Sequence, residues 1–560
     1  MQSFLQVFKL WDNPLFLKGF RARLRPRQML GWGVITFVFT LMMTLIFFNG
    51  ATNRANFVIE NAAKATFLPV LVIQALIMFL LGTRAVAVGI TMERDAGIVD
   101  FHRMTPMQTT PKIFGYLFGL AAREYFMFAM TIPFTVFATV VGKLSPTRVL
   151  HLYMIFFCSV WLYHITGFTV GMLAKRARSA GIMAQLAIIG LYIFMPQFAR
   201  WGFTFLGYLT VIPVYSGIIM GELSTFGTVA QSQRMLETVK SWQFIGFYNM
   251  ELHATVFTLM IQGLLFTFMF LLVRRKFEDE RQHAFSKPLG LAFFTTLQFL
   301  VLGSLWPFLT KPELSSKYKI VTNIRNFGNA SLAYQVYLFG VFFIFFLIAA
   351  GSAFLVINSI VPTWESYIKG LRRRKKLKLP RIPLMSDAAT GLYVCFGMIL
   401  LSSMSYALMW WLASSSGTFF QNLPSISLLL GVPFLFGGTL FCIQNAREFF
   451  STAGFFVFLF FFWIVPGLLA LLILSIGNAP LAASYTSITI PLVSLAFSVF
   501  SPMEQIFNVG GMPMWVRGNA STLMVVGIFV QLLPGIVIFS MLKQKKLKAM
   551  QLEKVIPPSQ

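Results

Sequence analysis

The sequence predicts an all-α polytopic membrane protein. Of its 560 residues, 57% are hydrophobic and only 11% are charged. Apolar stretches of ~20 residues, each enough to cross the ~30 Å hydrocarbon core of a bilayer, recur about a dozen times. Lipid admits only helices or closed barrels. Because the stretches are continuous rather than alternating, we expect helices to span the membrane.

Residues 1–29 predict an amphipathic helix that lies on the membrane surface. Lys9, Asp12 and Lys18 are spread among apolar residues. A signal peptide would place its charges first and follow them with an unbroken apolar core. The mixed pattern is typical of an interfacial helix.

About twelve spanning helices are predicted. They are 30–49, 66–90, 113–141, 149–173, 179–197 and 250–273, then 289–309, 332–357, 388–412, 425–443, 452–476 and 521–542. Two further apolar stretches, 201–220 and 483–501, contain prolines that interrupt helices, so we expect them to be outer re-entrant or interfacial segments. Counting them as spans would give 13 or 14.

The basic residues predict that both chain ends are cytosolic, including the basic tail 543–560. With that orientation, 31 of the 45 Lys and Arg residues fall in cytosolic segments, as the positive-inside bias requires. Residues 310–331 are the exception, with four positive charges on the outer side. The same bias accounts for the net charge of +27 without nucleic acid as a partner.

The second half of the chain repeats the first at an offset of about 272 residues. Glu93 and Gly97 correspond to Glu365 and Gly370. A repeat in which both halves begin and end on the same side is a parallel repeat, and such pairs enclose a pathway at their interface. Chance similarity between apolar helices is the alternative.

The repeat sets the predicted domains. The first six-helix half covers 30–275 and the second covers 289–542, with a cytosolic linker at 276–288. Each half contains one cytosolic loop after its second span, at 91–112 and 358–387.

The first loop is the most informative polar segment, and it reads TMERDAGIVDFHRMTPMQTTPK. A glycine can end a helix, and a proline fixes a turn. Charged groups give register on a partner surface. The residues predicted to couple the chain to a partner are Glu93, Arg94, Asp95, Gly97, Asp100, Arg103, Thr105 and Pro106. The alternative is a solvated loop with ordinary helix caps.

This loop resembles the coupling loop of ABC type-2 exporter permeases. The family pattern is E-[RK]-E/D-x-G-[TI]-[LV], then a T-P-[LM] turn, then [KE]-I-hydrophobic-Gly at the third span. The matching residues are Glu93, Arg94, Asp95, Gly97, Ile98, Val99, Thr105, Pro106, Met107, Lys112, Ile113 and Gly115. The resemblance covers most of residues 1–275 and, more faintly, 276–550.

The resemblance implies a permease subunit that is not itself an enzyme and holds no cofactor. ATP and Mg would belong to a separate ABC ATPase, which docks on the loop and on the N-terminal surface helix. The chain agrees in having no G-x-x-x-x-G-K-[ST] motif. The expected activity is outward movement of a lipid-like, polysaccharide or hydrophobic small-molecule substrate across a bacterial inner membrane. One chain could supply both permease halves.

A second function stays open, namely an ATPase-independent secondary transporter or lipid flippase. It would require ionisable residues near the midplane of the membrane. The spans offer few of these. Arg84, Arg123 and Glu124 are the charges predicted inside them, and we expect Arg84 to pair with Glu124 and tie spans two and three together. Snorkelling to the interface is the alternative.

The second loop departs from the pattern. It keeps Glu365 and Gly370 but continues into a basic cluster that begins Arg372, Arg373, Arg374 and lacks the T-P-[LM] turn. Such a cluster could bind anionic lipid headgroups, at ~1 kcal/mol per charge, or an acidic ATPase face. Plain positive-inside topology also explains it. We therefore predict an asymmetric pair of loops, with residues 93–107 as the intact copy.

Overall fold

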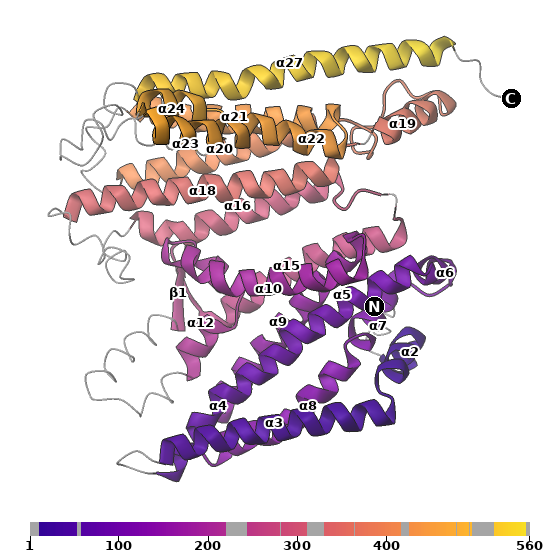
Figure 1. Cartoon of the computed structure of the whole chain (residues 1–560), viewed down its shortest axis with the longest axis vertical. Coiled ribbons are helices and arrows are strands. Elements are labelled where there is room, and N and C mark those ends of the chain that lie inside the picture. Colours follow the sequence, from indigo (N-terminus) through magenta and orange to yellow (C-terminus); the bar gives the residue numbers. More distant parts are fainter. Residues whose placement is uncertain are drawn as a thin grey trace. The chain divides into compact units, whose positions relative to one another are not determined.

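The protein divides into two compact helical units, Met1–Gln282 and His283–Gln560 (Figure 1). The computed structural model describes residues 10–52, 58–219, 243–280, 282–310, 330–362, 364–415, 425–477, 479–491, 493–494 and 520–555. Residues 1–9 of the predicted surface helix and 556–560 of the predicted tail lie outside these ranges.

Helices make up nearly all of the described part of the first unit. In chain order its elements are η1 (Leu10–Asp12), α2 (Pro14–Arg23), α3 (Pro26–Thr52), α4 (Ile59–Ala75), the π-helix η2 (Leu76–Gly82), α5 (Thr83–Asp95), α6 (Ile98–Met104), α7 (Thr109–Gly119), α8 (Ala122–Val140), α9 (Pro146–Leu173), α10 (Ala177–Arg200), α11 (Thr204–Gly207), α12 (Ile212–Val214), the π-helix η3 (Tyr215–Ile219), the antiparallel strands β1 (Phe244–Phe247) and β2 (Met250–His253), and α15 (Ala254–Glu278).

Ten helices within the described ranges are long and apolar enough to cross a membrane. They confirm a helical, polytopic integral membrane protein. Two predicted spans are not among the ten. The span predicted at 425–443 lies within α21 (Ser425–Phe449). The span predicted at 113–141 is not one helix, since α7 ends at Gly119 and α8 begins at Ala122.

Helix α2 crosses the third predicted span next to its break. It lies across α7, where a Cβ added at Gly19 would come within 2.7 Å of the Gly119 carbonyl carbon. The break at Leu120 and Ala121 follows this crossing directly. Apolar composition marks a stretch as membrane-compatible but does not require it to be continuous, so hydropathy alone missed the break.

Helix α9 is the centre of the first unit and packs against α5, α10 and α15. Glycines allow the close approach to α5. A Cβ at Gly167 would lie 2.6 Å from the Thr83 carbonyl oxygen, and one at Gly171 would lie 2.6 Å from that of Ala87. Small residues at such crossings are the usual means by which membrane helices pack closely.

The second unit is also mainly helical in its described part. Its elements are α16 (Lys287–Thr310), α18 (Ala330–Ile360), α19 (Trp364–Lys376), α20 (Leu392–Ser415), α21 (Ser425–Phe449), α22 (Thr452–Leu459), the π-helix η7 (Phe460–Ile464), α23 (Val465–Gly477), α24 (Pro480–Ser487) and α27 (Ala520–Val555). Helix α21 packs against α27, α20 and α18, and α16 packs against α20.

The two proline-containing apolar stretches differ in how much is described. Within the described residues 201–219, the helices are the short α11, α12 and η3, none of which is long enough to span a bilayer. Helix α24 covers the start of 483–501, but residues 495–501 lie outside the described ranges. The predicted span 250–273 begins later than expected, because Met250–His253 is strand β2.

Candidate functional site

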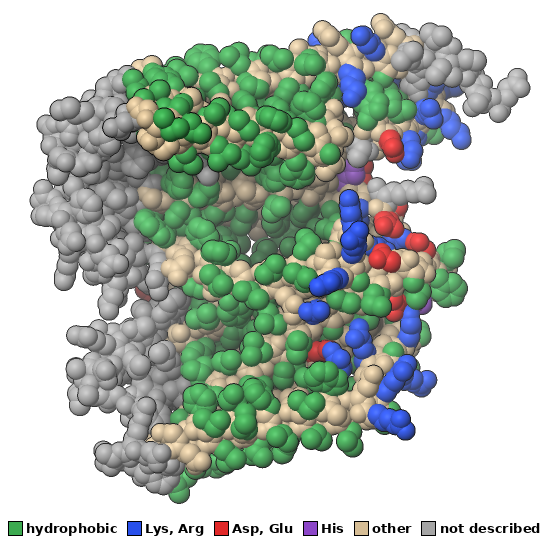
Figure 2. Space-filling model, viewed as in Figure 1, with side chains coloured by type: hydrophobic (Ala, Val, Ile, Leu, Met, Phe, Trp, Pro, Cys, Tyr) green, Lys and Arg blue, Asp and Glu red, His purple; other side chains and the backbone are tan. Residues whose placement is uncertain are grey.

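Charged side chains gather at one end of the first unit, around α2 and α6 (Figure 2). The body of the unit shows mainly apolar side chains in the same view. This contrast places the predicted coupling loop outside the apolar zone, where a polar segment can be hydrated.

The loop consists of one short helix between two turns. Helix α5 ends at Asp95, and Gly97 adopts a left-handed conformation with φ +72° before α6 begins. A Cβ at Gly97 would meet nothing within 4 Å, so the glycine is needed for its backbone conformation and not for a close approach. The prediction that Gly97 can end a helix is confirmed.

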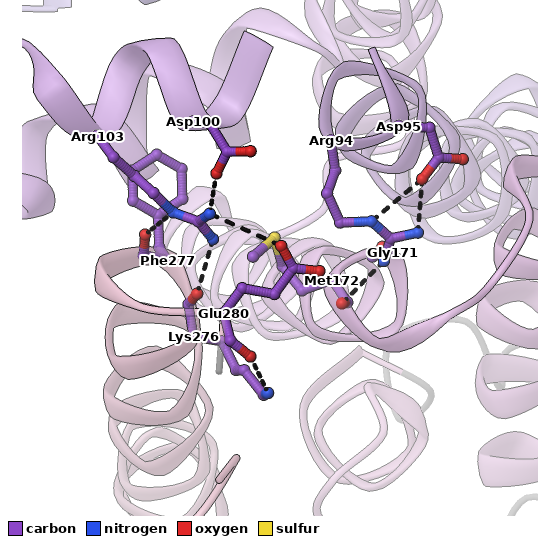
Figure 3. Close-up of polar contacts among 9 residues, drawn as sticks. All are labelled: Arg94, Asp95, Asp100, Arg103, Gly171, Met172, Lys276, Phe277 and Glu280. Carbon is purple, nitrogen blue, oxygen red and sulfur yellow. Dashed lines mark hydrogen bonds and ion pairs between the residues drawn. The ribbon is translucent and has the colours of Figure 1, made fainter. Parts of the chain in front are cut away.

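Arg94 caps the end of α9. Its guanidinium donates hydrogen bonds to the carbonyl oxygens of Gly171 at 3.1 Å and Met172 at 2.9 Å (Figure 3). It also donates to the Ala174 carbonyl at 2.6 Å. The last carbonyls of a helix lack intrahelical partners and carry partial negative charge, so a cation stabilises them. Asp95 accepts from the same guanidinium at 2.8 Å.

Arg103 caps the end of α15 in the same way. It donates to the carbonyl oxygens of Phe277 (2.7 Å) and Lys276 (3.2 Å), and it pairs with Asp100 (Figure 3). Glu280 lies 3.7 Å from the same guanidinium. Both loop arginines predicted to face a partner are therefore bound within the first unit. The loop is thereby fixed to the ends of α9 and α15, both of which are long and apolar enough to span a membrane.

Glu93 joins the loop to α2 and α7. Its carboxylate accepts hydrogen bonds from Lys18 Nζ at 3.0 Å and from the Tyr116 hydroxyl at 2.6 Å. Asn13 adds a second link, since its side chain caps the start of α2 and donates to the Pro111 carbonyl at 2.7 Å. Helix α2 and the loop are thus one assembly. The sequence motif did not reveal the roles of Asn13, Lys18 and Tyr116.

The second turn is held by buried polar contacts. The Thr105 hydroxyl donates to the His102 carbonyl at 2.7 Å, and Lys112 Nζ donates to the Thr105 carbonyl at 3.1 Å. Pro106 follows an extended Thr105, which is the conformation that a following proline favours. Pro106 itself is exposed.

Burial lowers the pKa of His102, the Lys18 ammonium lowers it further, and the Glu93 carboxylate opposes them. The imidazole is therefore neutral at pH 7. Its Nε2 has no hydrogen-bond partner within the described part of the chain. Burial also lowers the pKa of Lys112.

The outward face of the loop is apolar with an acidic border. Met92, Phe101 and Met104 are 59%, 61% and 80% exposed. Asp95 and Asp100 are exposed beside them. Large apolar side chains that cluster outside the apolar zone indicate an interaction surface. We refer to these five residues as the docking face.

The second loop differs from the first in that its helix is basic. Its helix α19 buries Tyr367 and Leu371, while Arg372 and Arg373 are exposed and Arg374 is half-buried. Glu365 is also exposed. Gly370 permits a close approach, because a Cβ there would collide with Ala388.

A buried lysine fixes the rest of the second loop. Lys287, 1% exposed at the start of α16, donates to the carbonyls of Leu384 (3.3 Å), Ser386 (2.6 Å) and Ala389 (2.6 Å). Helix α19 in turn meets the end of α27, where the Lys545 ammonium lies 4.5 Å from the Trp364 ring centroid. The sequence motif pointed to neither contact.

The predicted pairing of Arg84 with Glu124 is wrong. Arg84 donates to the Gln185 side chain of α10 at 3.2 Å. Glu124 is fully buried and pairs with its neighbour Arg123 at 2.5 Å. The Arg123 guanidinium also lies 5.2 Å from the Trp32 ring centroid. An adjacent arginine reaches Glu124 without bringing spans two and three together, and spacing alone did not reveal this.

A hydrogen-bonded network inside the first unit was not predicted. Gln74 donates to the hydroxyls of Thr131 and Thr135, both at 2.9 Å, and accepts from Tyr153 at 2.5 Å. A buried amide of this kind is stable only when its polar atoms are satisfied. The network links α4, α8 and α9 beside η2.

No family model, curated protein or solved structure matches the chain. The likeness to ABC type-2 permeases therefore rests on the residues of the loop.

Proposed function

We propose that the chain is the membrane-spanning subunit of an exporter and that a separate ATPase binds the docking face. The helical, apolar architecture fits a membrane transport protein. The observation that carries the proposal is that the loop contains two groups of residues, one bound to neighbouring helices and one exposed. Arg94 and Arg103 are bound to neighbouring helix ends, whereas Met92, Phe101 and Met104 are exposed.

The acidic border favours a protein partner over a lipid surface. Asp95 and Asp100 are each paired with a loop arginine, but both are exposed in the same segment as the apolar side chains. Anionic headgroups would repel carboxylates, whereas a protein surface with basic residues would complement them. An apolar centre with a charged rim is the usual anatomy of a protein interface.

The loop is also connected so as to transmit movement. Arg94 binds the end of α9, Arg103 binds the end of α15, and Glu93 binds α2 and α7. A partner that displaces α6 would displace these helices with it as a rigid body. The energy of ATP hydrolysis would reach the transport pathway through this assembly.

The substrate class follows from the resemblance alone, and we propose a lipid-like, polysaccharide or hydrophobic small molecule. We further propose that the charged end faces the cytosol, in agreement with the positive-inside bias. The unequal loops indicate unequal docking, with the first unit as the main contact.

Co-isolation with an ATPase tests this function. We expect a tagged chain, solubilised in mild detergent, to elute with an ATPase chain and to hydrolyse ATP. Replacing Phe101 and Met104 by serine should lower the captured ATPase at least about tenfold, because two apolar anchors each contribute more than ~1 kcal/mol. Val140→Ser is the matched control, since Val140 is 68% exposed elsewhere in the unit. Equal capture by the double variant and the control would refute the docking face.

A further inference from the structure

A groove of about 580 Å³ is lined by residues of α20, α21 and α27 in the second unit. Figure 1 shows these three helices. Its walls are apolar and include Phe396, Phe434, Leu532 and Ile536. The hydroxyl of Ser403, which also lines it, already donates to the Ile399 carbonyl at 2.8 Å. The groove therefore offers hydrocarbon contact and little hydrogen bonding.

The groove opens on the surface of helices that are long and apolar enough to span a bilayer. Phe396, Phe434 and Ile536 on its rim are 56%, 59% and 47% exposed. The lining of α21 runs from Pro433 to Phe441, which is ~12 Å of helix at 1.5 Å per residue. An elongated apolar slot at membrane depth is suited to an acyl chain. A second spanning helix, ~30 Å long and ~10 Å wide, would take up several times this volume.

One cation lies in line with the groove. Leu532, Ile536, Phe539 and Lys543 are spaced i, i+4, i+7 and i+11 and so share one face of α27. Lys543 is exposed about 10 Å beyond Ile536, toward the basic end of that helix. The Phe539 ring lies tilted against that of Phe441, with their centroids 5.8 Å apart, and extends the apolar wall in the same direction.

The nearby carboxylate of Glu448 does not pair with Lys543. Glu448 at the end of α21 is paired with Lys546 and accepts from the Thr390 hydroxyl at 3.0 Å. Lys546 is thus committed to Glu448. Lys543 has no ion-pair partner within the described part of the chain and can meet an anion at the end of the groove.

We propose that the groove binds one acyl chain of an anionic phospholipid whose phosphate pairs with Lys543. The ligand class follows from the two parts together, an apolar slot and a lysine on the same helix face. The basic helix α19, which contacts α27, strengthens the local preference for negative headgroups. The proposal is independent of the ATPase, because none of these residues belongs to the docking face.

Native mass spectrometry of the full chain tests the headgroup contact. The probes are phosphatidylglycerol and phosphatidylcholine with identical acyl chains. We expect the wild-type chain to retain phosphatidylglycerol preferentially. Lys543→Gln should weaken that binding about fivefold, the factor for ~1 kcal/mol per charge, and leave phosphatidylcholine unchanged. Lys548→Gln removes an exposed cation on another face of α27 and should change neither.

A groove-filling variant tests the acyl-chain contact. A Cβ at Gly437 would lie 3.4 Å from Ile399, an ordinary contact, so Gly437→Leu should fold and fill the groove. Both lipids should then be lost. Gly351→Leu is the control, because a Cβ there meets nothing within 4 Å. The proposal fails if Gly437→Leu retains lipid as its control does. It also fails if Lys543→Gln and Lys548→Gln retain phosphatidylglycerol equally. This second comparison tests the proposal even if Gly437→Leu does not fold.

Discussion

Arg94 and Arg103 stabilise the ends of helices α9 and α15 through backbone carbonyls. Such contacts use the fork of the guanidinium, which can donate to several acceptors at once. A lysine has the charge but not this geometry. The loop therefore depends on these arginines for its position as well as for its charge.

Removal of Arg94 should destabilise the first unit. Arg94→Ala leaves three partly buried carbonyls without this donor, and we expect a loss of about 1–3 kcal/mol. Thermal unfolding of the detergent-solubilised chain measures it. Arg176→Ala, which removes an exposed arginine just beyond the end of α9, should cost less than about 0.5 kcal/mol. Similar unfolding midpoints for the two variants would show that Arg94 does not cap α9.

His102 should make the loop sensitive to acid. Folding lowers its pKa below about 6.5, so the unfolded loop binds protons more readily. Its contribution to stability is complete above pH 6.5 and is lost as the pH falls through the lowered value. Hydrogen exchange of α6, corrected for intrinsic rates, should therefore rise between pH 7.5 and 5.5. His102→Phe keeps a ring beside Tyr116 and should abolish the change. A change that persists in the variant would assign the effect to another group.

At the scale of elements, the crossing of α2 over α7 determines the shape of the charged end. It depends on Gly19 and Gly119, whose backbones come too close for a side chain between them. Lys18 and Asn13 then reach Glu93 and Pro111. The crossing brings the surface helix and the loop into one assembly.

A side chain at the crossing should release α2. In Gly19→Val the new Cβ would lie 2.7 Å from backbone atoms of Gly119, which cannot move aside as a flexible side chain could. Limited proteolysis should then cut near residue 24, and ATPase capture should fall. Gly31→Val is the matched control, since a Cβ at Gly31 meets nothing within 4 Å. Unchanged protease resistance in Gly19→Val would contradict the observed crossing.

Sequence patterns predicted the helical membrane class and the helix-ending role of Gly97, because apolar length and glycine conformation are local properties. They did not predict the break after Gly119 or the partner of Arg84. Both depend on which helices meet in space, and a continuous apolar stretch does not contain that information. The Arg123–Glu124 pair was the one available sign that the third span was unusual.

At the scale of the whole molecule, the two units present different charged ends. The first has a loop fixed by arginines with an acidic, apolar outer face, and the second has the basic helix α19 and the buried Lys287. The predicted repeat of six helices stays a prediction. The difference between the loops agrees with the unequal roles that we propose for the two units.

Site-specific photo-cross-linking in cells tests the central claim most directly. A photoreactive amino acid at Phe101 should form an adduct with a chain that contains a G-x-x-x-x-G-K-[ST] phosphate loop, as identified by mass spectrometry. The same group at Val140, which is 68% exposed at the end of α8, should not. An ATPase adduct from Phe101 alone is the result that we predict. Absence of any ATPase adduct from Phe101, or equal adducts from both positions, would contradict the proposed docking.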